Sequence, residues 1–134
     1  MDIKKHIAAL GFVPKNGTNG IYHKIYVDYA IEIEYEKQSI NYGSGITADS
    51  KTTQNFSDAE NFVVLECVDR LLTKGYKPQN IVLEKTWPSG HGTSGRLDIC
   101  VNREDGTPYM LIECKTYGKE YNKESAKIHK DGGQ

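Results

Sequence analysis

Three charged residues beside two apolar segments have the types and the spacing for chemistry on a phosphodiester. Glu113 and Lys115 follow the apolar residues 109–112 and are two positions apart, so in a strand their side chains share one face. Asp98 lies in a second apolar segment upstream. Two neighbouring carboxylates repel each other unless a cation lies between them, and Mg²⁺ takes oxygen ligands of this kind. A bound metal ion lowers the pKa of its water, and a lysine ammonium can orient that water or neutralise charge on the phosphate.

The turn between the two segments decides whether Asp98 and Glu113 meet. Asp105-Gly106 is a favoured two-residue hairpin turn, with Glu104 facing Thr107. Continued along the ladder, this register places Asp98 directly opposite Glu113 on one face of the sheet. A symmetric four-residue loop keeps the register, and a loop with an odd number of residues does not. The simpler alternative is a structural salt bridge at the rim of a sheet, with Asp98 as an ordinary strand-end acid.

The apolar periodicity around these residues predicts an α/β fold with a mixed sheet. From residue 57 onward we expect a helix that Gly75 ends, three strands, and a lysine-rich helix. The strands are expected at residues 81–87, 96–101 and 108–115, and the lysine-rich helix at about 119–130.

The N-terminal part predicts a smaller unit of a different kind. We expect a short helix at residues 2–10, an antiparallel hairpin within residues 21–37, and a third short strand after it. Residues 43–58 are small and polar, which is typical of a linker. We therefore expect an N-terminal helix and small sheet over residues 1–54 and the main core over residues 55–134.

Composition sets limits on the class of protein. With 26% charged and 37% hydrophobic residues among 134, and no long apolar run, the chain is expected to be a cytoplasmic globular protein without a membrane span. Its three cysteines are widely spaced in apolar segments, which favours reduced core residues. The net charge of −1 means that nucleic acid would need a local basic surface.

The sequence resembles a known nuclease superfamily. "SGRLDICV" followed by "LIECKT" is similar to the PD-(D/E)xK motif. More closely, "NFSDAENFVVLECVDRLLTKGY", "IVLEKTW", "SGRLDI" and "LIECKTYGKE" together resemble the N-terminal nuclease regions of restriction-modification proteins, in the type I family and its methylase fusions. Leu97 stands where the motif often has proline, a position that varies widely in the superfamily.

The resemblance implies a restriction-endonuclease-like core and a set of roles. Asp98 and Glu113 would be metal ligands, the carbonyl of Cys114 a further ligand, and Lys115 the catalytic lysine, with Mg²⁺ as the expected ion and Mn²⁺ as a substitute. In similar nucleases an acid on the first helix completes the metal shell, which is where Glu60 stands. From the residues alone, Glu60 could equally close a capping box with Ser57.

The residues expected to contact DNA carry weaker signals. His91 and Arg96 lie in or beside a glycine-rich loop, and Lys119 and Lys123 belong to a row of lysines that recurs every four residues. Such a row is usually a solvated helix face, and below a nuclease site it can also follow phosphates. The resemblance adds Gln134, as the first residue of a Gln-x-x-x-Tyr motif.

The predicted function is metal-dependent cleavage of double-stranded DNA by an endonuclease domain that works with other domains or subunits of a restriction-modification complex. The resemblance also implies one more strand after the lysine-rich helix. Without that strand we expect the chain alone to be weak or inactive and able to form a homodimer through its open sheet edge. The alternatives are a DNA-repair or junction-type nuclease of the same fold, and a non-catalytic interaction module.

Overall fold

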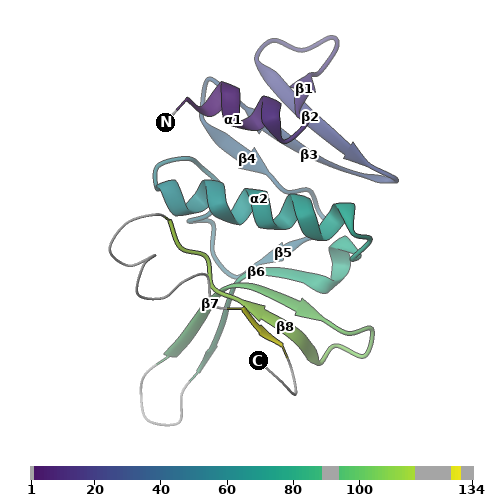
Figure 1. Ribbon diagram of the computed structural model, residues 1–134, viewed down its shortest axis with the longest axis vertical. Coiled ribbons are helices and arrows are strands. Elements are labelled where there is room, and N and C mark those ends of the chain that lie inside the picture. Colours follow the sequence, from purple (N-terminus) through teal and green to yellow (C-terminus); the bar gives the residue numbers. More distant parts are fainter. Residues whose placement is uncertain (1, 89–93, 117–127, 131–134) are drawn as a thin grey trace.

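The structure is a computed structural model that describes residues 2–88, 94–116 and 128–130 (Figure 1). These residues form two α-helices and two sheets, one of which is mixed, so the predicted α/β class is confirmed. No helix in this part of the chain is long and apolar enough to cross a membrane. The predicted contacts His91, Lys119, Lys123 and Gln134 lie outside the described residues.

The N-terminal part forms the small antiparallel sheet that the alternation of its side chains predicts. After helix α1 (Ile3–Ala9), the strands pair in the order β1-β2-β3-β4. Their bounds are β1 Val13–Pro14, β2 Ile21–Tyr26, β3 Tyr29–Glu34 and β4 Ser39–Asn41. Strands β2 and β3 pair from Ile21↔Glu34 to Tyr26↔Tyr29, and the third short strand is confirmed as β4.

The second sheet carries the predicted chemistry. Its order is β5-β6-β7-β8-β9, and β5 is parallel to β6 while the other pairs are antiparallel. The bounds are β5 Thr47–Ala48, β6 Ile81–Pro88, β7 Ser94–Asn102, β8 Pro108–Ile112 and β9 Ile128–Lys130. Because β5 lies within residues 43–58, the interpretation of that segment as a linker is wrong.

Helix α2 (Ala59–Thr73) lies between the two sheets (Figure 1). Its fully buried Leu65 and Val68 belong to one apolar core with Ile33 of the first sheet and Ile99 of the second. Burial of each large aliphatic side chain contributes about 2 kcal/mol, so this shared core holds both sheets against one helix. The helix ends as predicted, with Lys74 as the C-cap and Gly75 at a φ of 101°. A 3₁₀ turn, Pro78–Asn80, then leads into β6.

The C-terminal segment differs from the prediction. A helix through Lys130 is wrong for residues 128–130, which form strand β9, and residues 117–127 lie outside the described part of the chain. Strand β9 pairs with β8 from Met110↔Lys130 to Ile112↔Ile128. The backbone N–H and C=O groups of β8, which were expected to lie at an open sheet edge, therefore pair with β9. This pairing is a physical reason for a strand at residues 128–130.

The β7–β8 hairpin reaches the predicted register by an unpredicted route. The Arg103 amide donates to the carbonyl of Thr107 at 2.7 Å, which leaves an odd loop of residues 104–106 instead of the two-residue turn. The register then shifts between Val101 and Asn102, where Tyr109 is the extra residue of a bulge. From Val101↔Met110 to Ile99↔Ile112 the pairing is the predicted one.

A buried polar cluster links the first sheet to α2. Asp69 of α2 accepts hydrogen bonds from Lys24 Nζ at 2.6 Å and from the Tyr26 hydroxyl at 2.7 Å, and Lys24 also donates to the carbonyl of Leu10 at 2.7 Å. Burial and the bond to Asp69 raise the pKa of the Tyr26 hydroxyl, so it remains a donor. The cluster therefore fixes the orientation of α2 on the sheet.

We expect Asp69→Ala to lower the free energy of unfolding by about 3 kcal/mol, because it leaves the part-buried Lys24 ammonium without its carboxylate. Urea unfolding measures this loss. The matched control is Lys15→Ala, which removes the more exposed ion pair with Glu32 and should cost less than about 1 kcal/mol. Equal losses in the two variants would show that the cluster does not hold α2 in place.

Candidate functional site

The acid of β7 is bound to the segment that follows β8. The described pairing of these strands ends at Ile99↔Ile112. Beyond this pair, the Cys114 amide donates to Oδ2 of Asp98 at 2.7 Å. This hydrogen bond fixes the carboxylate of Asp98 beside residues 113–115. The structure thus brings Asp98 next to the Glu113–Lys115 segment, as the predicted register requires.

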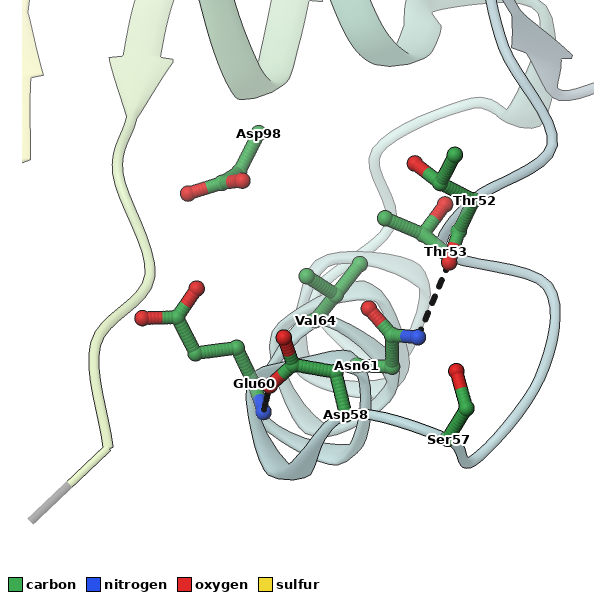
Figure 2. Close-up of a pocket in the computed structure, with 8 residues that line it drawn as sticks. All are labelled: Thr52, Thr53, Ser57, Asp58, Glu60, Asn61, Val64 and Asp98. Carbon is green, nitrogen blue, oxygen red and sulfur yellow. Dashed lines mark hydrogen bonds between the residues drawn. The ribbon is translucent and has the colours of Figure 1, made fainter.

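Asp98 also faces a pocket of about 220 Å³ at the N-terminal end of α2. Figure 2 shows the carboxylates of Asp98 and Glu60 on one side of this pocket, with Thr52 and Thr53 on the other. The full lining is Thr52, Thr53, Ser57, Asp58, Glu60, Asn61, Val64 and Asp98. One wall is therefore acidic and comes from β7 and α2, and the opposite wall is hydroxyl-bearing and precedes α2.

The start of α2 separates the two interpretations of Glu60. The N-cap is Asp58, whose side chain accepts from the Glu60 amide at 2.9 Å, and Ser57 donates to Asn55 Oδ1 instead. The capping box of Ser57 with Glu60 is therefore wrong. Asp58 has the extended backbone that a cap requires, which places Glu60 at the second helical position. From there the Glu60 side chain lines the pocket.

Glu113 and Lys115 form an ion pair beside this pocket. Lys115 Nζ lies 3.7 Å from Glu113 Oε2, and their side chains are 18% and 36% exposed. Neither residue is among those that line the pocket. A structural salt bridge would give the same contact, so what favours chemistry is Asp98, which contacts this segment and also lines the pocket with Glu60.

The thiol of Cys114 points into the core, while its backbone faces Asp98. Its pKa lies well above the usual value because the thiol hydrogen-bonds to Cys67, is buried, and lies near the negative charges of Asp98 and Glu60. The residue is 4% exposed and its side chain belongs to the apolar core, so the group of Cys114 that is predicted as a ligand is its backbone carbonyl.

The donor chemistry of the site fits a small divalent cation. Two carboxylates, Asp98 and Glu60, line one wall of the pocket, and Mg²⁺ is commonly held by one or two carboxylates with water completing the octahedron. Within residues 2–88, 94–116 and 128–130, no three acidic, histidine or cysteine side chains come together as a metal site. For Glu113 to join Asp98 and Glu60 as a third acid, its side chain would have to turn from Lys115 toward the pocket, and a backbone carbonyl and water would supply the remaining ligands.

Of the residues expected to contact DNA, only Arg96 has a described backbone. It lies in β7 opposite Thr86. Its side chain lies outside the described part of the structure, as do the whole of His91, Lys119, Lys123 and Gln134. Their contact with DNA stays a prediction.

The prediction missed Glu84, a fully buried acid in β6. Its Oε2 accepts hydrogen bonds from Ser50, Thr52 and Thr53, and the last two line the pocket. The available signal was weak: Glu84 directly follows the apolar residues 81–83, and a segment rich in hydroxyl groups, residues 50–53, lies elsewhere in the sequence.

Comparison with known proteins identifies a family. Residues 59–130 match the model of the family described as type I restriction enzyme R protein N terminus, and this match covers more than half of the 134-residue chain. The matched region contains α2 and strands β6 to β9. No curated protein and no solved structure matches the chain significantly.

The start of α2 generates a stability prediction. Asp58→Ala should cost about 1 kcal/mol because the Glu60 amide loses its acceptor. Glu60→Gln should change stability by less than about 0.5 kcal/mol, since the lost attraction to the helix N-terminus is offset by relief of repulsion from Asp98. Urea unfolding without divalent ions measures both, with Ser57→Ala as the control. A loss in Glu60→Gln as large as in Asp58→Ala would assign the capping role to Glu60.

Proposed function

We propose that this chain, which belongs to the family of type I restriction enzyme R protein N termini, is a metal-dependent DNA endonuclease domain of the PD-(D/E)xK type. The family itself supports a role in restriction-modification. One observation carries the step to cleavage: Asp98 is bound to the Glu113–Lys115 segment and shares a pocket with Glu60. Hydrolysis of a DNA phosphodiester is the reaction that fits acids and a lysine so arranged.

The proposed ligands of Mg²⁺ are Asp98, Glu113, Glu60 and the carbonyl of Cys114, and Mn²⁺ would substitute. When bound, such an ion polarises a phosphoryl oxygen and makes its water a nucleophile near neutral pH. Two of these groups, Asp98 and Glu60, already face one pocket, which supports their part of the set.

The residues of the chain have distinct tasks in this proposal. Asp98 is held in one orientation by the Cys114 amide, so its carboxylate needs little reorganisation to bind a cation. Lys115 is an ammonium and cannot be a metal ligand. Its Nζ lies near Glu113, from where it can orient the attacking water and balance the negative charge that grows on the phosphate oxygens.

The substrate in this proposal is double-stranded DNA, and sequence preference comes from another domain or subunit of a restriction-modification complex. Arg96, His91, Lys119, Lys123 and Gln134 are proposed contacts to the DNA. A helix that enters the major groove would carry base-reading side chains on an exposed face, whereas α2 is packed between two sheets. A contact to the phosphates is therefore the mode that we propose for this chain.

We expect Asp98→Asn and Lys115→Met each to lower plasmid nicking in Mg²⁺ or Mn²⁺ by about a hundredfold or more, measured with protein in excess. Calorimetric titration with Mn²⁺ should separate their roles. Asp98→Asn keeps an oxygen for the Cys114 amide but loses its charge, so Mn²⁺ affinity should fall by about tenfold or more. Lys115→Met keeps the aliphatic stem and should bind Mn²⁺ as the wild type does.

The control is Lys37→Met, which removes an exposed lysine paired with Glu34 in the first sheet and should leave nicking and Mn²⁺ binding unchanged. Identical Mn²⁺ heats for wild type and Asp98→Asn would remove the proposed metal site. Wild-type nicking by Lys115→Met would remove Lys115 from the mechanism. Mn²⁺ binding without nicking, both by the chain alone and within the complete restriction-modification complex, would leave an interaction module in place of an enzyme.

A further inference from the structure

Glu84 is an unusual residue for the middle of a core strand. Its side chain is fully buried in β6, next to the fully buried Leu83. Its backbone φ is 50°, in the left-handed region that residues with a side chain rarely adopt. A buried carboxylate in an uncommon backbone conformation is a feature that often accompanies a functional site.

Three hydrogen bonds of Glu84 converge on one short segment. Its Oε2 accepts from Ser50 Oγ at 3.1 Å, from the Thr53 amide at 3.0 Å, and from the Thr52 hydroxyl. All three donors lie within residues 50–53, which we call the hydroxyl segment. Three donors on one carboxylate oxygen help to stabilise a buried charge, so the acid and the segment stabilise each other's position.

The hydroxyl segment forms the wall of the pocket that faces the candidate metal ligands. Thr52 and Thr53 line the pocket opposite Asp98 and Glu60 (Figure 2). The Thr52 carbonyl also accepts from Asn61 Nδ2 at 2.9 Å, which ties the segment to the first turn of α2. The position of this wall therefore depends on two sets of contacts, the hydrogen bonds to Glu84 of β6 and the hydrogen bond to Asn61 of α2.

Glu84 also lies beside Asp98 in the sheet. The pairs Leu83↔Ile99 and Lys85↔Leu97 enclose Glu84 on β6 and Asp98 on β7 at the same level of the ladder. Asp98 of the candidate site and Glu84, which binds the hydroxyl segment of the opposite wall, are therefore neighbours on adjacent strands.

We propose that Glu84 is a positioning residue, which fixes the hydroxyl segment and thereby sets the width of the pocket that receives the scissile phosphodiester. Glu84 touches neither metal nor DNA in this inference, which rests on the proposed nuclease function. Its loss should misplace the phosphate relative to the acidic wall and leave that wall's own ligands in place.

The test compares single-turnover plasmid nicking by wild type, Glu84→Gln and Thr52→Val, with Mn²⁺ affinity and melting temperature measured on the same samples. Glu84→Gln keeps the shape but places an amide against donors, and should lower the rate at saturating protein by about tenfold or more. Mn²⁺ affinity should stay within about twofold, because the proposed ligands are on the other wall. Thr52→Val removes one donor without altering the buried acid. It should lower the nicking rate by a smaller factor than Glu84→Gln does and should likewise leave Mn²⁺ affinity nearly unchanged.

The matched control is Asp49→Asn. Asp49 lies next to the hydroxyl segment but binds Thr86, with Oδ2 accepting from its amide at 2.8 Å, and its own side chain does not line the pocket. This variant should nick at the wild-type rate. If Asp49→Asn loses as much rate as Thr52→Val, general loosening explains the effect and the inference fails.

Two further results would overturn the inference. A folded Glu84→Gln or Thr52→Val variant that nicks at the wild-type rate would show that the position of the hydroxyl segment does not affect the reaction. A loss of Mn²⁺ affinity in Glu84→Gln as large as its loss of rate would place Glu84 among the metal ligands instead. A wild-type chain that neither nicks DNA nor binds Mn²⁺ overturns the proposed function itself, and the wild-type arm separates that failure from a failure of the Glu84 inference alone.

Discussion

The hydrogen bond from the Cys114 amide to Asp98 is the interaction on which the candidate site depends. It lies just beyond the last described pair of β7 and β8, where the two strands could otherwise separate. A shift of one residue in the hairpin would turn every side chain of one strand to the other face. Asp98 would then leave the pocket, and Glu60 would face it without the second acid. The register of one hairpin therefore decides whether the acids of the motif can act together.

That register shows how much of the site the sequence can predict. Asp105-Gly106 correctly indicated a hairpin, but the loop has three residues: Asp105 Oδ1 accepts from the Thr107 amide at 2.9 Å, and Gly106 adopts a φ of 90°. An odd loop alone would have moved Asp98 out of place. The bulge at Tyr109 restores the pairing, and nothing in the residue types marks it. The pairing next to Asp98 was thus predicted correctly, although the predicted two-residue turn was wrong.

Two other differences concern polar side chains, because neither composition nor spacing shows which group such a side chain binds. Residues 43–58 have the composition of a linker because composition does not show what a polar side chain binds, and here hydroxyl groups bind the buried Glu84. Glu60 stands at the right spacing for a capping box, yet Asp58 provides the cap. Apolar periodicity, by contrast, predicted both helices of the described chain and the order of the strands from β6 to β8, since core faces repeat regularly along the sequence.

The central claim is that Asp98 and Glu60 hold a divalent cation together. Anomalous X-ray diffraction from crystals of the chain soaked in Mn²⁺ tests it most directly, because it locates the ion without reference to activity. The account predicts an anomalous peak in the pocket between the two carboxylates, present in the wild type and lost in Asp98→Asn. Peaks confined to exposed acids such as Glu104 and Asp105, with none in the pocket, would contradict it.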